Sequence, residues 1–175
     1  MTSTLAQQAL DLYYTGSTEQ KISRTNELFA LHGKSLLREE RIIKALRQLK
    51  DHSKALSEQM LLMKLDRLCS KCAGTDNGGC CSSYMEANSN VILLLINRLY
   101  GVLVEEQHQR EAECCFLGPR GCLLPIKPVF CLNYNCKHIT GQASKQDMTA
   151  LEQASGQVLA QQTQLEDMIV EYILK

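Results

Sequence analysis

Nine cysteines are the residues of this chain best suited to chemistry, and all of them lie in one window from Cys69 to Cys136. This window covers well under half of the 175 residues. Thiolates are preferred ligands of zinc, of iron–sulfur clusters and of other soft metal centres. The clustering of the nine cysteines predicts a localised metal or iron–sulfur site rather than free cysteines scattered through a core.

The first part of the window has the spacing of a metal half-site. Cys69 and Cys72 form a Cys-x-x-Cys pair, whose turn points both sulfurs at one metal while the N–H groups between them donate to sulfur. The pair Cys80-Cys81 follows after a loop, residues 73–79, whose glycines allow a close backbone approach to a cluster. Adjacent residues of an extended chain point to opposite sides. Cys80 and Cys81 must therefore lie in a turn or bind two different metal atoms.

The compartment expected from the sequence is reducing. The amino terminus lacks a basic segment followed by an apolar run, as a secretory signal would have. In the cytosol dense cysteine indicates metal binding or catalysis more often than disulfides, and nine is an odd number for a paired framework. We therefore expect a cytoplasmic protein whose thiols bind metal.

Charge and hydropathy exclude two classes of partner. Lysine plus arginine equals aspartate plus glutamate at 19 each, so no nucleic acid or anionic lipid partner is expected. The most apolar run, residues 91–104, contains Asn97 and Arg98 and is shorter than the roughly 20 residues that span a bilayer. It predicts a buried helix and no membrane association.

The segments that must position the cysteines have the apolar spacing of helices. Ser17 and Gln20 have the spacing of a capping box, and a long helix should follow them, with Gly33 as a point of interruption. A second run, residues 56–68, leads directly into Cys69. The helical pattern returns from about residue 87 to 113 and again from 146 to 174.

The last of these helices repeats Leu151, Val158 and Leu165 at seven-residue intervals, which is typical of a helix packed along another helix and is compatible with a homodimer. Residues 116–140 contain all three prolines, so neither a regular helix nor a central strand is expected there. We predict one all-α domain over residues 1–175, a bundle of about four long helices. An irregular cysteine-rich region, residues 69–136, should lie at one end.

The run from Cys115 to Cys136 resembles the second half of the YkgJ-like cysteine-cluster proteins, a family of zinc- or iron-chelating domains. It reads Cys-Phe-Leu-Gly-Pro-Arg-Gly-Cys, then Lys127-Pro128 in place of the usual Arg-Pro, then Cys131 and Cys136. The earlier cysteine pairs match the first half of that family. The resemblance implies a metal site, with these ligands: Cys69, Cys72, Cys80, Cys81, Cys115, Cys122, Cys131 and Cys136.

Eight thiolates can hold two zinc ions or two cubane-type clusters, and ligand type alone does not choose between them. We favour an iron–sulfur cluster of the 4Fe–4S type, because the loops are rich in potential donors to sulfide and no histidine joins the matched ligands. Zinc is the alternative. Cys114 lies outside the pattern and can be a buried hydrophobe, and His138 is either a surface residue or a substitute ligand.

The leading functional hypothesis is a protein that transfers electrons to a redox partner or delivers a cluster or metal to an acceptor protein. One rival is a zinc-stabilised module whose helices bind another protein. A second rival is a methyltransferase-associated cysteine-cluster protein, since flagellin lysine methylases contain a related signature. No glycine-rich strand–turn–helix for a methyl donor is found here, so a stand-alone enzyme is not favoured and no catalytic residue is predicted.

Overall fold

The protein is all-α. A computed structural model describes residues 10–73, 81–106, 113–119 and 121–175. Its elements are α2 (Thr18–Leu36), α3 (Glu40–Leu62), α4 (Leu65–Ala73), α5 (Ser83–Glu86), α6 (Val91–Leu99), β1 (Leu117–Gly118), β2 (Gly121–Cys122), α7 (Val129–Asn133), α8 (Lys137–Thr140) and α9 (Lys145–Ile173). The two strands form a small antiparallel hairpin. Within these described ranges, no helix combines the length and the apolarity that crossing a membrane requires.

The predicted capping box at Ser17 is present. The Ser17 hydroxyl accepts from the backbone N–H of Gln20 at 3.2 Å, and the Gln20 side chain accepts from the Ser17 N–H at 3.0 Å. Gly33 does not interrupt the helix, which runs through it to Leu36, and the ring of Phe29 lies only 2.9 Å from where a Cβ at residue 33 would be. The chain turns instead after Leu36, and α3 starts at Glu40.

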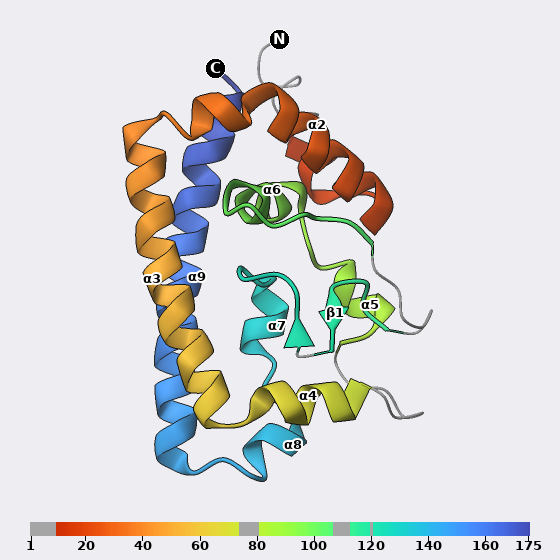
Figure 1. Ribbon diagram of the computed structural model, residues 1–175, viewed down its shortest axis with the longest axis vertical. Coiled ribbons are helices and arrows are strands. Elements are labelled where there is room, and N and C mark those ends of the chain that lie inside the picture. The colour runs from red at the N-terminus through yellow and green to blue at the C-terminus, as the bar shows by residue number, and fades with distance from the viewer. Residues whose placement is uncertain (1–9, 74–80, 107–112, 120) are drawn as a thin grey trace.

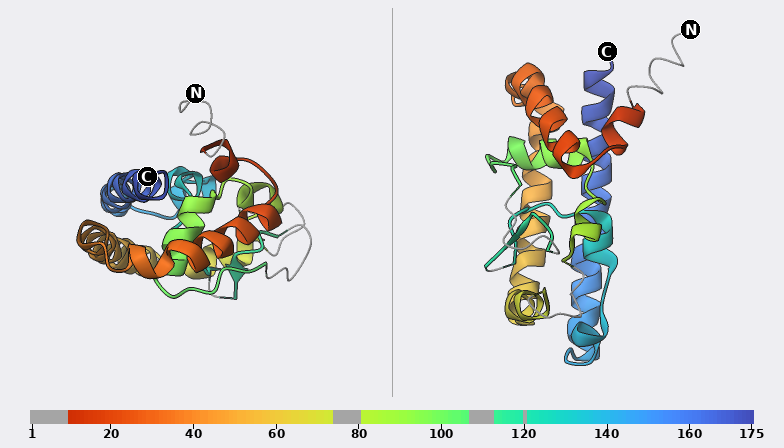
Figure 2. Two further views of the ribbon diagram at one scale, coloured as in Figure 1. Left: turned by 90° about the horizontal axis from the view of Figure 1, so that it is seen from above. Right: turned by 90° about the vertical axis from the view of Figure 1, so that its right-hand side faces the viewer.

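Helices α3 and α9 form the long axis of the molecule and run side by side in all views (Figures 1 and 2). The predicted repeat Leu151, Val158 and Leu165 is buried against the apolar stripe of α3, which includes Leu46 and Leu49. A second capping box, at Ser144, fixes the start of α9. The predicted packing of the last helix along another helix is confirmed.

Helix α6 is the centre of the core and is shorter than its apolar pattern suggests. Residues 91–97 are all buried, with α2 and α9 packed against the helix. It ends at Leu99 because Gly101 adopts a positive φ of 82°, a conformation that ends helices. The prediction of helix to residue 113 is therefore wrong for residues 100–106, which are not helical.

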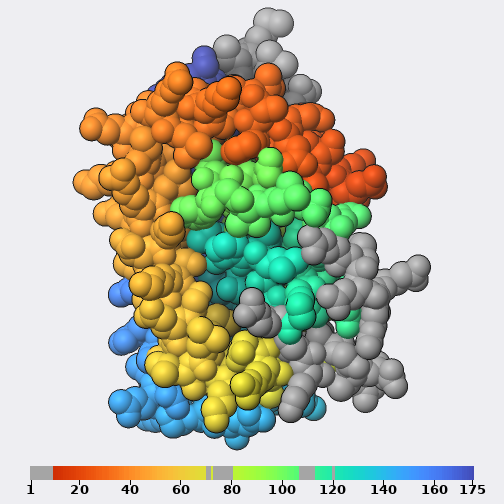
Figure 3. Space-filling model, in the orientation of Figure 1, coloured from red at the N-terminus to blue at the C-terminus, as the bar shows by residue number. Residues whose placement is uncertain are grey.

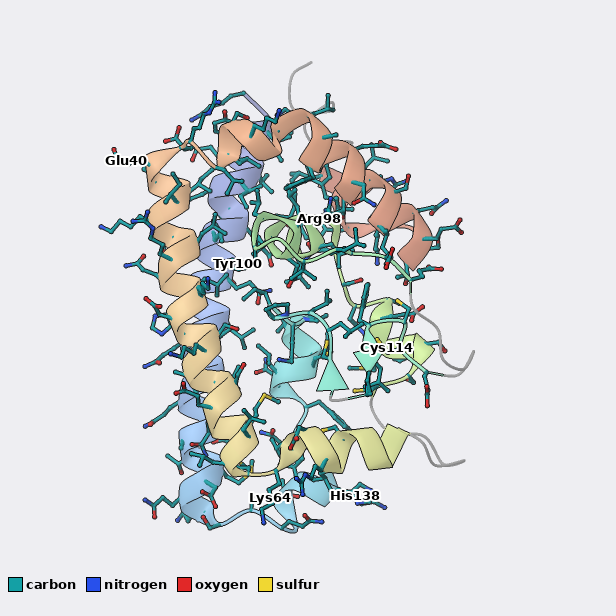
Figure 4. The ribbon with its side chains drawn as sticks, viewed as in Figure 1. Glu40, Lys64, Arg98, Tyr100, Cys114 and His138 are labelled. Carbon is teal, nitrogen blue, oxygen red and sulfur yellow. The ribbon has the colours of Figure 1, made fainter. Side chains whose placement is uncertain are left out.

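The cysteine-bearing segments fill the space beside the α3–α9 pair. The chain bends sharply at Lys64, whose φ is 57°, so α4 leaves α3 at a steep angle and crosses the lower part of the molecule (Figures 1 and 4). The proline-containing segment is irregular as predicted, apart from the hairpin and the short helices α7 and α8. Figure 3 shows the segment that follows residue 113 reaching the surface between α6 and α4.

Candidate metal centre

Four cysteines from three separate parts of the chain line one small pocket. Cys69 and Cys72 stand three residues apart on α4, which places them on the same face of the helix. Cys81 comes from the chain before α5, and Cys136 precedes α8. The enclosed space is about 10 Å³ and is lined by Leu68, Cys69, Cys72, Cys81, Cys136, His138 and Ile139. We call these four cysteines the pocket thiols.

Local backbone geometry explains how Cys136 and His138 line the same pocket. Residues two apart within a helix point in different directions. Cys136 is instead the N-cap of α8, with an extended backbone (φ −67°, ψ 163°), while its carbonyl accepts from Ile139 N at 2.9 Å. His138 is exposed at the edge of the pocket, on the helix beneath α4 (Figure 4).

A second group contains Cys114, Cys115 and Cys122, which we call the hairpin thiols. The N–H of Leu117 donates to the carbonyl of Cys114 at 2.9 Å, so residues 114–117 form a turn that leads into β1. Cys122 lies opposite Leu117 in the hairpin. All three cysteines belong to one apolar cluster, and Cys115 is fully buried in it.

The hairpin thiols interact with one another. Cys115 hydrogen-bonds to the sulfur of Cys114, which lowers the pKa of the Cys114 thiol and raises that of the Cys115 thiol. Burial raises the pKa of the Cys122 thiol, and the positive charge of Lys127 opposes that effect. The carboxylate of Glu86 accepts from the backbone N–H of Cys115 at 2.7 Å, and its charge opposes ionisation of both Cys114 and Cys115.

A short backbone contact connects the two groups of thiols. The N–H of Cys114 donates to the carbonyl of Cys81 at 3.2 Å, and an antiparallel bridge pairs Ser82 with Glu113. Strand β2 also packs against α4. These contacts place residues 81–82 beside residues 113–114, which brings the two halves of the cysteine window together.

The predicted ligands divide unevenly between these groups. Cys69, Cys72 and Cys81 share the pocket with Cys136, whereas Cys115 and Cys122 lie with Cys114. Cys131 lies on α7 and does not line the pocket, and Cys80 falls outside the described residues. Among the residues that are described, no three metal-ligating side chains already converge in a geometry that holds an ion, and no disulfide joins two of the eight described cysteines.

One residue near these thiols, Glu86, is not singled out by any sequence pattern. Glu86 lies almost 30 positions before Cys115, and no motif connects the two. His138, expected either as a surface residue or as a substitute ligand, is exposed and also lines the pocket. Its place in the pocket depends on the extended backbone at Cys136.

Comparisons with protein-family models, with curated proteins and with solved structures find no match to this chain. The resemblance to the cysteine-cluster family thus stays a prediction. The function proposed below is argued from the geometry of the chain's own residues.

Proposed function

We propose that the pocket thiols hold a metal ion and that the protein is a metal carrier. The observation that supports this most strongly is that Cys69, Cys72, Cys81 and Cys136, from three chain segments, line the same small pocket. Four sulfurs are a complete ligand set for a tetrahedral thiolate site. When bound, the metal would supply Lewis-acid charge and cross-link α4, α8 and the chain before α5.

The size of the pocket favours one ion over a cluster. A space of about 10 Å³ accommodates roughly one water-sized body. A single zinc or iron ion fits such a space once the four side chains turn inward, whereas a 4Fe–4S cluster needs the pocket to widen. We therefore place zinc first. An iron–sulfur cluster is the second candidate, supported by the hairpin thiols that lie next to Cys81 and could enlarge the ligand set.

The short helix α8 supports delivery rather than purely structural binding. Cys136 is attached to a helix of only four residues, which is exposed over most of its length. Moving such an element costs few buried contacts, so one ligand can leave without disturbing the α3–α9 pair. An acceptor protein with its own thiols would take the ion by replacing Cys136 first.

The same proposal covers compartment, architecture and partners. Thiols packed this closely remain reduced in the cytoplasm, which we propose as the location. The helices α2, α3, α6 and α9 serve as the bundle-like frame on which the cysteine-rich region rests. The partner is a metal-accepting or redox protein rather than nucleic acid or membrane, in keeping with the balanced charge. The repeat of Leu151, Val158 and Leu165 that suggested a homodimer packs against α3 within one chain, so it lends a dimer no further support.

The experiment is metal analysis with absorption spectroscopy on protein purified anaerobically from iron- and zinc-replete cells. We expect about one tightly bound zinc per chain and a colourless protein. Brown protein with iron and acid-labile sulfide would support the second candidate. Absence of any stoichiometric metal, both as purified and after reconstitution, would refute the proposal.

Two cysteine variants distinguish the ligand assignments. Cys72→Ser should lose the metal, because a tetrahedral site with three thiolates and a hydroxyl binds far more weakly. The family-like pattern predicts the same loss for Cys131→Ser, whereas the pocket predicts that this variant keeps its metal. Ser83→Ala, an exposed change on nearby α5, is the matched control. Full metal content in Cys72→Ser would refute the pocket assignment.

A further inference from the structure

Helix α7 presents a pair of aromatic side chains to solvent. The N–H of Tyr134 donates to the carbonyl of Phe130 at 3.0 Å, so these two residues stand one helical turn apart and share a face of the helix. Phe130 is 63% exposed, Tyr134 is 56% exposed and the neighbouring Val129 is 47% exposed. Leu132, on the opposite side, is buried, and α7 packs against α9 (Figure 2). We call Val129, Phe130 and Tyr134 the α7 face.

The exposure of these rings contrasts with the rest of the chain. The sequence contains only three phenylalanines and no tryptophan. Of the other two phenylalanines, Phe116 is buried and Phe29 packs against the main core. Single exposed apolar residues are common on protein surfaces, whereas contiguous ones are typical of an interface, and aromatic residues are enriched at interfaces. The α7 face therefore has the character of a binding surface.

The segment that carries the α7 face is basic. Residues 114–146 contain four lysines or arginines and no aspartate or glutamate, although the whole chain has 19 residues of each sign. Lys127 comes three residues before Phe130, and Lys137 comes three residues after Tyr134, so each lysine Cα lies within about 11 Å of the Cα of its aromatic residue. Neither lysine forms an ion pair with a described residue. A complementary partner brings carboxylates around an apolar centre.

We propose that the α7 face docks an acidic, amphipathic segment of the protein that accepts the metal. The identity of this partner rests on the metal-carrier function proposed above. Tyr134 is two residues from Cys136, which is at most about 7 Å between Cα atoms. Cys136 lines the pocket and is attached to the short helix α8. A protein seated on the α7 face would hold its own thiols beside the ligand that leaves first.

A protein segment suits this surface better than a nucleic acid or a membrane. The net charge of the chain is zero, so no long-range field attracts a polyanion. Helix α7 has only five residues, so its apolar face is far smaller than that of an amphipathic helix that binds a bilayer. The aliphatic Val129 also extends the apolar surface beyond the rings, which base stacking does not require.

The test measures binding of a synthetic helical peptide of about 20 residues, with glutamates on one face, leucines on the other and one Cys-x-x-Cys pair. Because the chain has no tryptophan, Phe130→Trp places a single fluorophore on the α7 face and keeps an aromatic ring there. Its emission should shift to the blue when the peptide binds, and added salt should weaken binding. Fluorescence anisotropy of labelled peptide then compares wild type with Phe130→Ala and Lys137→Glu, which should each weaken binding at least about fivefold.

Leu31→Ala and Lys44→Glu are the matched controls, because both side chains are exposed on other helices, and both variants should bind the peptide as wild type does. Zinc content should be the same in all variants, whereas zinc transfer to the peptide thiols should be slower in Phe130→Ala. Wild-type protein without metal would refute the carrier function alone, because anisotropy reports docking without zinc.

Four results would overturn the docking proposal. The first is the absence of saturable peptide binding, and the second is equal binding of a peptide with lysines in place of the glutamates. The third is unchanged binding in folded Phe130→Ala. The fourth is a larger emission shift of Phe130→Trp with a poly(U) oligonucleotide or with phosphatidylserine vesicles, which would assign the α7 face to nucleic acid or to a membrane surface instead.

Discussion

Replacing Asn97 tests how the buried core fixes the cysteine-bearing segment. Asn97 is fully buried in α6, and its side chain is bonded to both backbone groups of Ile126. Its Nδ2 donates to the Ile126 carbonyl at 2.9 Å, and its Oδ1 accepts from the Ile126 N–H at 3.1 Å. Nδ2 also donates to the Leu93 carbonyl. That carbonyl lies inside the helix and also accepts the regular backbone hydrogen bond of the helix.

Asn97→Ala should destabilise the protein by about 2–6 kcal/mol. The change leaves two buried backbone groups of Ile126 without partners, and each such group costs about 1–3 kcal/mol. A domain of this kind has a free energy of unfolding of about 5–15 kcal/mol, so the loss is a large share. Urea unfolding followed by far-UV circular dichroism measures it, with the exposed Asn133→Ala in α7 as the control, expected within about 0.5 kcal/mol of wild type.

The variant Asn97→Asp should show a pH dependence of stability that a simple packing defect would not produce. An aspartate at this buried position should have a raised pKa, because burial disfavours its charged form. Its stability should therefore be greatest at acidic pH, where the neutral acid can donate to the Ile126 carbonyl, and should fall as pH rises through that pKa. A loss below about 1 kcal/mol in Asn97→Ala, or an Asn97→Asp variant with the pH profile of wild type, would refute the reasoning.

Two further predictions concern Glu166 and a pair of glycines. Burial raises the pKa of Glu166, which accepts hydrogen bonds from Gln162 and Asn90. The contribution of the Glu166 carboxyl group to stability is therefore fully present at low pH and is lost as pH rises through the raised pKa. Glu166→Gln should remove that decline and stabilise the protein at neutral pH. The midpoints of urea unfolding between pH 4 and pH 8 measure this effect. A pH profile unchanged from wild type would contradict the raised pKa of Glu166. Gly101→Ala should cost about 1 kcal/mol because φ is 82° there, whereas Gly156→Ala, in the exposed face of α9 with open space around it, should gain about 0.5–1 kcal/mol. Thermal melts compare the pair, and equal effects of both substitutions would be incompatible with the backbone argument.

Local signals in the sequence were sufficient for the long helices. The capping box at Ser17 depends on contacts within one helical turn, and the repeat from Leu151 to Leu165 is a spacing that can be read within one helix; both are present in the structure. The end of α6 was missed because apolar spacing continues past Leu99, while the positive φ of Gly101 leaves no mark on periodicity. The bend at Lys64 is likewise invisible to a pattern of apolar residues.

The grouping of the thiols could be predicted only in part. The Cys69–Cys72 spacing on a helix end follows from local geometry. Cys81 shares the pocket with Cys136, and its carbonyl accepts from the N–H of Cys114. Both contacts join segments far apart in the sequence, and the spacing of the cysteines does not encode which segments meet.

The pairing of α3 with α9 also means that the nascent chain must expose the apolar stripe of α3 until α9 has been synthesised. Helix α3 ends at Leu62, and α9 begins only at Lys145, more than 80 residues later. At a synthesis rate of about 5–20 residues per second, roughly 5 to 20 s pass before α9 is complete. During that interval the apolar stripe of α3 has no permanent cover, so this stripe is the part of the emerging protein that a ribosome-associated chaperone would have to shield.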